Sequence, residues 1–329
     1  MSREKSAQRR ESSLEQARTL SMHESRMDED RKTWTSAPEP PGGPSSSASR
    51  SLRYGDGVFV TMAVRDGVVL DVRRQLARLR RAAGHIGLRP PAPFVDRDEA
   101  PFALGAVLET LGGGPTSDAT ARVQWSAGPG PRGFGRDEME AEAIVDLSAA
   151  PAARRPAVVR LPEAESPLPA LPRWKTCSAL AQVQCERAAR ARGADTGVRT
   201  RDGLALETGS ANLFWLADGR LFTPAAELPL YAGSVRERVI ECASDAGLSV
   251  DEGEFGAGEL DRADAVVLTN GARGLEFAAS LDGRGLPEPS EVLHLLAEAV
   301  LARRALDGVL LGDPGKSAMH DVEDADAPS

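Results

Sequence analysis

The fold is decided by the stretch Glu207-Thr208-Gly209-Ser210-Ala211-Asn212-Leu213-Phe214, taken together with Arg173-Trp174-Lys175-Thr176 upstream. Lys175 is predicted to open a helix, and Glu207 to end a strand. A lysine amine can form a Schiff base, and a carboxylate can hold a ring nitrogen protonated so that the ring accepts electrons. Together the two residues are what pyridoxal phosphate chemistry requires. Taken alone, Lys175 can equally be a surface lysine at a helix start, and a lone glutamate more commonly faces water.

The composition of the 329 residues excludes several classes of protein. A formal charge of −9 disfavours nucleic acid or an anionic membrane as the main partner. The three cysteines are too few and too scattered for a disulfide framework or a zinc site, which fits a reduced cytoplasm. No apolar run approaches the ~20 residues that span a bilayer, and the N-terminus lacks the apolar region of a signal peptide. We therefore expect a cytoplasmic protein without a metal site.

Changes in composition along the chain predict two domains between two tails. The predicted segments are a disordered tail at 1–31, a small α/β domain at 32–150, a larger cofactor-binding α+β domain at 151–311 and an acidic tail at 312–329. A stretch rich in Pro, Gly and Ser at 37–49 reads as a loop. Trp34 is predicted to be the first residue that docks on a folded domain.

Hydrophobic periodicity and turn residues predict the elements of the two domains. Helices are expected at 76–86, 102–111, 176–192, 234–246 and 291–306. Strands are expected at 57–64, 68–70, 120–125, 143–147, 157–161, 196–200, 204–207, 212–216, 220–222 and 265–269. The irregular alternation with tight hairpins favours α+β layers over a doubly wound parallel sheet, and no G-x-G-x-x-G joins a strand to a helix.

Six stretches, in this order, resemble the class IV aminotransferases, the fold-type IV pyridoxal phosphate enzymes. They are Arg53-Tyr54-Gly55-Asp56-Gly57-Val58-Phe59, Gln75-Leu76-Ala77-Arg78-Leu79, Trp174-Lys175-Thr176, Glu207 to Phe214, Gly233-Ser234-Val235-Arg236 and Leu268-Thr269-Asn270-Gly271. The resemblance implies an α+β two-domain fold, pyridoxal 5'-phosphate as cofactor and a small-molecule amino substrate. It also implies a homodimer, in which a loop of the partner completes the site between the domains.

The resemblance also assigns roles to single residues. Lys175 resembles the Schiff-base lysine that moves the proton, and Glu207 the partner of the pyridine nitrogen. Arg78 resembles the phosphate-binding arginine, since a guanidinium binds phosphate with two hydrogen bonds. The alternative for Arg78 is a helix-surface arginine. Thr61, on the strand after the turn, matches a residue that assists proton transfer, although packing within the strand is the commoner role.

The cofactor phosphate is expected at the start of the helix that Gly233 precedes, where free N–H groups and the helix dipole favour an anion. The resemblance places Ser234, Val235, Asn270 and Gly271 there, and simple helix capping is the alternative. Val235 and Gly271 stand where the family usually has hydroxyl side chains. These departures leave a non-catalytic homologue open.

The loop Ser126-Ala127-Gly128-Pro129-Gly130-Pro131-Arg132-Gly133-Phe134 resembles the R-G-x-G-x-R-G-Y pattern of 4-amino-4-deoxychorismate lyases, with departures at Ala127 and Phe134. Arg132 then becomes the candidate for holding a substrate carboxylate, and Phe59 a further substrate contact. The alternative for Arg132 is a solvated loop arginine. The expected activity is that of the lyase, which releases pyruvate and forms 4-aminobenzoate. The alternative is an aminotransferase for branched-chain or D-amino acids.

Overall fold

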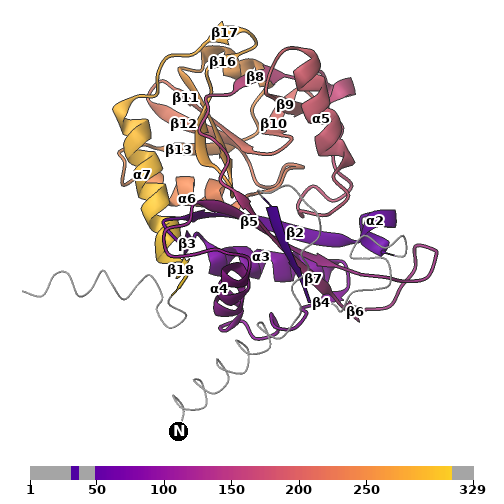
Figure 1. Ribbon diagram of the computed structural model, residues 1–329. Helices are drawn as coiled ribbons and strands as arrows, with labels where there is room; N and C mark the ends of the chain where they lie inside the picture. Colours follow the sequence, from indigo (N-terminus) through magenta and orange to yellow (C-terminus); the bar gives the residue numbers. More distant parts are fainter. Residues whose placement is uncertain (1–30, 37–48, 313–329) are drawn as a thin grey trace, which may run out of the picture. The chain divides into compact units, whose positions relative to one another are not determined.

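The computed structural model describes residues 31–36 and 49–312, which form two compact units (Figure 1). The first unit contains the described residues up to Pro151 together with those from Arg304 onward, and the second is Ala152–Arg303. The sequence predicts the second domain to run to 311, whereas the chain from Arg304 to Gly312 lies in the first unit. The predicted tails lie outside the described residues, except for Arg31 and Gly312.

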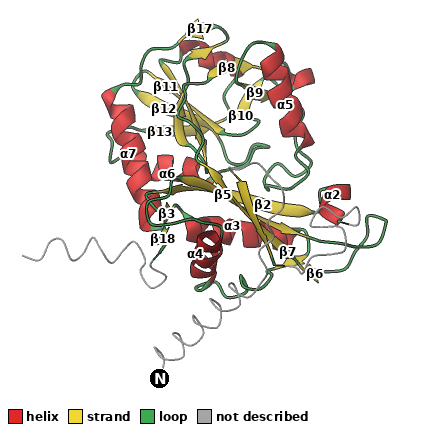
Figure 2. Cartoon of the chain, viewed as in Figure 1, coloured by secondary structure: helices red, strands yellow, loops and turns green. Residues whose placement is uncertain are grey.

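The first unit is built on a six-stranded sheet in the order β1-β7-β5-β2-β3-β18, with antiparallel pairing throughout (Figure 2). Its strands are β1 (Arg31–Thr35), β2 (Gly57–Arg65), β3 (Val68–Val69), β5 (Ala119–Ser126), β7 (Glu142–Ala149) and β18 (Val309–Leu310). Along β2 the side chains of Val58, Val60 and Met62 are buried, while Phe59 and Thr61 between them are half-buried. This period of two gives the sheet one apolar face and one mixed face.

Three helices and a short parallel strand pair complete the first unit. They are α2 (Arg50–Tyr54), α3 (Val72–His85), α4 (Ala100–Thr110) and the pair β4 (Leu88–Arg89) with β6 (Met139–Glu140). Trp34 on β1 is fully buried and meets Phe94 edge to face, which confirms its predicted docking. The strand itself is missed in the sequence because Trp34 is its one fully buried side chain.

The C-terminal segment of the first unit is held by a buried ion pair. Arg304 Nε lies 2.8 Å from Asp71 Oδ2, and the Asp71 N–H donates to the Arg304 carbonyl at 3.0 Å. Asp71 precedes α3 with a φ of 55°, a conformation that Asp tolerates better than most residues. Beyond Arg304, β18 pairs with β3. These contacts explain why the segment from 304 to 312 belongs to the first unit.

The second unit contains two five-stranded sheets. One has the order β10-β9-β8-β16-β17, and the other β13-β12-β11-β14-β15. The strands of the first sheet are β8 (Ala157–Arg160), β9 (Thr196–Arg201), β10 (Leu204–Thr208), β16 (Ser280–Leu281) and β17 (Arg284–Gly285). Those of the second are β11 (Asn212–Ala217), β12 (Arg220–Pro224), β13 (Val250–Gly253), β14 (Ala265–Asn270) and β15 (Gly274–Phe277).

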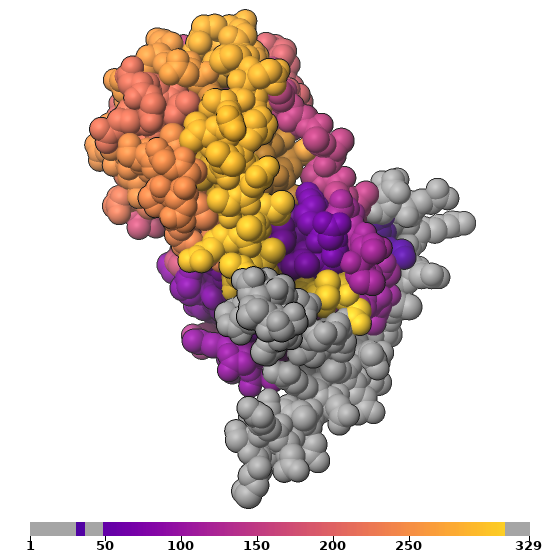
Figure 3. Space-filling model, turned by 90° about the vertical axis from the view of Figure 1, so that its left-hand side faces the viewer, coloured from indigo at the N-terminus to yellow at the C-terminus, as the bar shows by residue number. Residues whose placement is uncertain are grey.

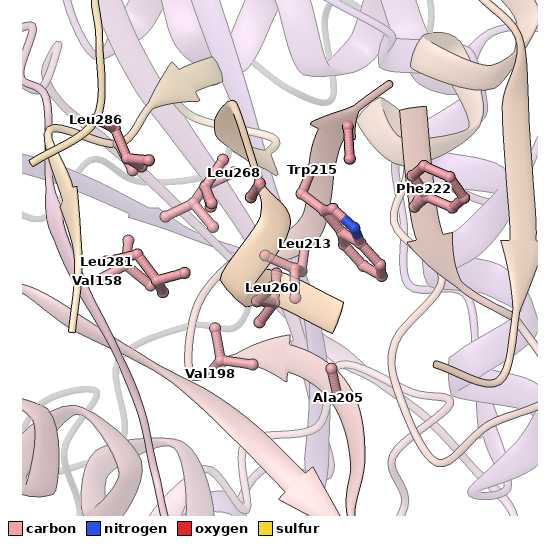
Figure 4. Close-up of a cluster of buried hydrophobic side chains, with 14 of the residues drawn as sticks. Val158, Val198, Ala205, Leu213, Trp215, Phe222, Leu260, Leu268, Leu281 and Leu286 are labelled. Carbon is pink, nitrogen blue, oxygen red and sulfur yellow. The ribbon is translucent and has the colours of Figure 1, made fainter. Parts of the chain in front are cut away.

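Apolar side chains of both sheets form one buried cluster (Figure 4). Val198 and Leu281 come from the first sheet, and Leu213, Trp215 and Leu268 from the second. A separate cluster joins the second sheet to α6 (Ser234–Ala243) and α7 (Glu291–Leu306), which is yellow on the face seen in Figure 3. The mixed α+β architecture that the sequence predicts is confirmed.

The helix predicted at 176–192 is α5 (Leu180–Ala191), so Lys175 does not open a helix. The chain from Lys175 to Ala179 is irregular, and the N–H of Thr176 and of Ala179 each donate to the carbonyl two residues earlier. Thr176, Cys177 and Ser178 are poor helix formers whose side chains favour such local turns. Lys175 therefore stands in a loop before the helix.

Candidate active site

Glu207 lies near the end of β10, where the pairing of β10 with β9 is interrupted by a bulge. Ala205 is opposite Thr200 and Thr208 is opposite Val198, so Leu206 and Glu207 together stand opposite Arg199. A bulge of this kind re-aims a side chain, and bulges are frequent beside active sites. Glu207 is only 7% exposed. The local irregularity therefore presents one buried carboxylate to its neighbours.

Three donors hold the Glu207 carboxylate. Arg199 Nη2 and the N–H of Tyr231, at 3.1 Å, donate to Oε1, while Asn212 Nδ2 donates to Oε2 at 3.0 Å. Burial raises the pKa of Glu207 to about 7, although the charges of Arg199 and Lys175 and the hydrogen bond from Tyr231 act in the opposite direction. The site thus holds a carboxylate that can exchange its proton near neutral pH.

Arg199 is a site residue that the sequence reasoning missed. Its side chain is fully buried on β9, which is rare for arginine unless it is paired. Besides Glu207, it donates to the Pro167 carbonyl at 3.4 Å. The sequence feature that could have indicated Arg199 is its position inside a predicted strand whose residues are mostly buried. The carboxylate that Arg199 pairs with could not be predicted, because the bulge in β10 determines it.

Asn212, the first residue of β11, connects Glu207 to the start of α6. Its amide nitrogen donates to Glu207 and to the Tyr231 carbonyl at 2.5 Å, and its Oδ1 accepts the N–H of Gly233 at 3.0 Å. A Cβ on Gly233 would lie 2.5 Å from Asn212 Oδ1, so this approach requires glycine. The side chain therefore fixes the distance between the carboxylate and the helix.

Lys175 belongs to the same cluster. Its Nζ lies 5.3 Å from the centroid of the Tyr231 ring, and its positive charge lowers the pKa of Glu207 against the effect of burial. The structure thus brings together the predicted lysine and glutamate, although they are far apart in the sequence. The half-buried amine of Lys175 can serve as a nucleophile and as a base, and the buried carboxylate of Glu207 can pair with the ring nitrogen of a cofactor.

The remaining predicted residues of the second unit gather around the start of α6 and the end of β14. Ser234 is buried, and the Val235 side chain packs in the apolar cluster with α7, so only the backbone of Val235 can meet a ligand. Asn270 Oδ1 accepts the N–H groups of Ala272 and Arg273, at 3.1 and 2.9 Å, which shapes the turn that contains Gly271.

Thr269 supplies a hydroxyl in this region. It stands directly opposite Asn212 in the pairing of β14 with β11, so the two side chains share a face. Its Oγ1 is buried and has no hydrogen-bond partner among residues 31–36 and 49–312. A buried hydroxyl without a partner is costly unless a ligand or water completes it. Thr269 lies in the motif Leu268-Thr269-Asn270-Gly271, which did not predict a role for this hydroxyl.

Phe59, Thr61, Arg78 and Arg132 belong to the first unit. Phe59 and Thr61 share the mixed face of the sheet with Arg122, which is opposite Thr61 and whose guanidinium lies 3.6 Å from the centroid of the Phe59 ring. Arg122 is a second residue that the sequence reasoning missed. Arg78 is half-buried on α3.

Arg132 is exposed in the loop Gly128–Gly135, and Phe134 beside it is 87% exposed. The loop is nevertheless anchored. Buried Arg50 donates to the carbonyls of Gly133 and Phe134 at 2.9 and 3.0 Å, and the Gly133 N–H donates to the Tyr54 hydroxyl at 3.1 Å. The structure therefore presents Arg132 on a fixed loop.

The described part of the chain holds no group of three or more His, Cys, Asp or Glu side chains placed to bind a metal ion. None of its helices is long and apolar enough to cross a membrane. All three cysteines are free thiols.

Comparison with known proteins supports one family. A family model described as amino-transferase class IV matches residues 57–280, more than half of the chain. An aminodeoxychorismate lyase of Vibrio harveyi is 28% identical over 73% of this chain and 87% of its own length. A D-alanine aminotransferase of Bacillus licheniformis is 23% identical over 78% of this chain and 92% of its own.

Solved structures share the fold. A branched-chain aminotransferase of Thermoproteus uzoniensis superposes with a TM-score of 0.73 at 21% identity, covering 85% of this chain and 98% of its own. A hypothetical aminotransferase of Mycobacterium tuberculosis in its PLP-bound form gives 0.67 at 24%, covering 82% and 96%.

Proposed function

Because this chain belongs to the class IV aminotransferase family, an enzyme family, we propose that it binds pyridoxal 5'-phosphate and acts as a 4-amino-4-deoxychorismate lyase. The observation that carries the proposal is the pairing of Lys175 with the buried Glu207 in one cluster. The second unit has no other described lysine, because the chain's other lysines are Lys5, Lys32 and Lys316.

The residues of the second unit fit the cofactor. Lys175 would hold it covalently, and Glu207 would pair with its ring nitrogen. The first N–H groups of α6 offer donors for a phosphate, as does the Thr269 hydroxyl, which has no hydrogen-bond partner in the part of the chain that the structure describes. Thr269 can replace the side-chain hydroxyls that are absent at Val235 and Gly271. In the first unit, Arg78 remains the proposed phosphate arginine.

When bound, pyridoxal phosphate supplies an electron sink for the carbon that carries the substrate amine. Lys175 Nζ would accept the proton from that carbon, and Thr61 would assist the transfer. The bond between the carbon ring of the substrate and the enolpyruvyl oxygen then breaks, and enolpyruvate takes up a proton to leave as pyruvate. The carbon ring that remains is aromatic and is released as 4-aminobenzoate. Glu207 would pair with the ring nitrogen of the cofactor throughout.

Two observations favour the lyase over an aminotransferase. The loop that carries Arg132 is fixed by Arg50 and Tyr54, so its guanidinium is presented for a carboxylate, with Phe59 as a further contact. The relative from Vibrio harveyi carries the name of this lyase. A relative from Methanocaldococcus jannaschii is named as a putative branched-chain-amino-acid aminotransferase, and it is 26% identical over 71% of this chain and 81% of its own. The experiments below therefore also test for aminotransferase activity.

The first experiment tests the cofactor. The full chain is mixed with pyridoxal 5'-phosphate, reduced with borohydride and digested, and the peptides are mapped by mass spectrometry. We expect the label at Lys175, unchanged in the control Lys32→Arg and absent from Lys175→Ala. Label at Lys32 alone, or no yellow complex, contradicts the proposal.

The second experiment tests the reaction. The loaded protein is supplied with 4-amino-4-deoxychorismate, and pyruvate and 4-aminobenzoate are measured. Release of both products in equal amounts supports the lyase. If no pyruvate forms, and an amino donor with a keto acid yields a new amino acid instead, the chain is an aminotransferase. Cytoplasmic location and a homodimer remain part of the proposal, and gel filtration tests the latter.

A further inference from the structure

We propose that Arg199 and Asn212 are positioning residues that keep Glu207 ionised and leave one acceptor position of its Oε2 for the ring nitrogen of the cofactor. The inference rests on the proposed binding of pyridoxal 5'-phosphate. It concerns residues that touch Glu207 and not the cofactor, so it adds to the roles of Lys175 and Glu207 themselves.

The Glu207 carboxylate has few acceptor positions left for a ligand. A carboxylate offers about four lone-pair positions, two on each oxygen. Both positions of Oε1 are taken, by Arg199 and by the Tyr231 N–H, and one of Oε2 is taken by Asn212. Among the described residues, the remaining acceptor position lies on Oε2. The arrangement thus selects one oxygen for the ligand.

The charged groups that face Glu207 are Arg199 and Lys175, and both lower its pKa against burial. The nearby Cys185 thiol on α5 stays protonated, because burial raises its pKa to about 12. When Lys175 is engaged in holding the cofactor, Arg199 is the cation that remains beside Oε1. A proton shared between Glu207 and a ring nitrogen then lies on the nitrogen, because Arg199 stabilises the carboxylate more than the protonated acid.

Asn212 fixes the position of Glu207 relative to the start of α6. Asn212 contacts Glu207 with its nitrogen and the Gly233 N–H with its oxygen, so one planar amide spans from the carboxylate to the first turn of α6. Glu207 is the proposed partner of the ring nitrogen, and the start of α6 is the proposed site of the phosphate, so the two would bind opposite ends of one cofactor. Asn212 therefore holds both ends at a fixed separation, which pre-organises the site.

The test uses pyridoxal 5'-phosphate labelled with nitrogen-15 in the ring, bound to the full-length protein. The nitrogen chemical shift reports whether the ring nitrogen carries the proton, and it needs no turnover. We expect a protonated nitrogen in the unchanged chain. In Arg199→Met we expect a shift toward the unprotonated value. The matched control is Arg304→Met, which breaks a similarly buried ion pair in the first unit and should leave the shift unchanged.

Arg199→Lys covers the case in which Arg199→Met does not fold. It keeps a positive charge but loses the planar fork, and we expect a smaller shift in the same direction. An unchanged nitrogen shift in the folded variant overturns the role of Arg199. If the unchanged chain does not bind the cofactor at all, the proposed function fails, and this inference fails with it.

Asn212 is tested by affinity. Absorbance titration with pyridoxal 5'-phosphate should show binding weaker by about 10–100-fold in Asn212→Ala, the range that supporting residues show in other sites. Ser210→Ala is the control, because Ser210 lies on the same turn but contacts Glu186. Equal dissociation constants for Asn212→Ala and the unchanged chain, with both folded, overturn the role of Asn212.

Discussion

Among residues 31–36 and 49–312, two ion pairs of arginine with a carboxylate have both side chains buried, and they stand in different surroundings. In the first unit, Asp71 and Arg304 are joined by side chains and by backbone, and they connect the start of α3 to the end of α7. In the second unit, Glu207 and Arg199 meet at a bulge, and within the described part of the chain one acceptor position of Glu207 has no donor, the position that we propose for the cofactor. Burial alone therefore does not distinguish a structural carboxylate from the proposed catalytic one; the difference between the two pairs lies in their hydrogen-bond partners.

The largest expected effect comes from replacing both partners of the second pair. Glu207→Gln combined with Arg199→Met removes two buried charges at once, so we expect a folded protein of about the original stability. Its turnover number should fall by about 10²–10⁴-fold, because the ring nitrogen loses its ionised partner. Urea unfolding and steady-state kinetics measure the two quantities. Near-normal turnover would show that Glu207 is structural like Asp71.

Changes in the Asp71–Arg304 pair should lower the stability of the protein and leave its cofactor affinity unchanged. Asp71→Asn leaves Arg304 buried without its countercharge, so the free energy of unfolding should fall by about 3–5 kcal/mol. Asn is chosen because it tolerates the positive φ of this position. The combination Asp71→Asn with Arg304→Met should recover much of the loss. Cofactor affinity should stay normal, and a changed affinity would contradict the separation between the two pairs.

The pH dependence of unfolding distinguishes the pairs further. Glu207 has a folded pKa of about 7 against an ordinary value of 4.5, so the unfolded chain loses this proton first as the pH rises. The cofactor-free protein should therefore lose up to about 3 kcal/mol of stability from this group between pH 4.5 and pH 7. The measurement is chemical unfolding at several pH values, compared with Glu207→Gln/Arg199→Met. Parallel curves for the two proteins would refute the titration.

Asp56, in the first unit, should show the reverse slope. Burial raises its pKa, but hydrogen bonds and charge from Arg136 and Arg50 outweigh burial and lower it overall. Asp56→Asn should cost about 1.5–3 kcal/mol at pH 7. The difference should shrink as the pH falls below the ordinary value of 3.8, because the unfolded chain then takes up the proton before the folded chain does. Thermal unfolding at both pH values checks this, and a difference that persists at low pH would rule out the ionic account.

The smallest expected effect is that of Tyr54→Phe. The substitution removes one hydrogen bond, from the Gly133 N–H to the Tyr54 hydroxyl, and keeps the ring contact with Phe134. The stability should change by about 1 kcal/mol or less. If Arg132 depends on this anchor to bind substrate, the Michaelis constant should rise while cofactor affinity stays the same. An unchanged Michaelis constant would show that Arg50 is a sufficient anchor.

The sequence predicted those parts of the molecule that depend on local patterns. The long helix α7 was expected at the residues where it lies, and β2, β5 and β11 were expected to within two residues, because periodicity and turn residues are local signals. The family, and with it the fold, followed from six ordered motifs and is confirmed. The two-residue strands β16 and β18 were missed, because each pairs with a strand that is distant in the sequence, β8 and β3 respectively.

The candidate site shows the same division. Lys175 and Glu207 could be paired through their motifs, whereas Arg199 could not, because its partner is chosen by a shift in strand pairing. Thr269 lay within a recognised motif, yet only the folded structure shows that its hydroxyl is buried and lacks a hydrogen-bond partner within the described ranges. Positions that a motif names can thus be predicted, and positions that tertiary contacts create cannot.

The pairing of β18 with β3 has a consequence for biosynthesis. The second unit is continuous in the chain, whereas the first unit needs residues from both ends of it. The ribosome therefore synthesises every residue of the second unit before it reaches β18, the last strand of the first sheet. The first unit therefore begins to be translated before the second unit but is completed after it. Until β18 is available to pair with it, β3 remains an open edge of the sheet.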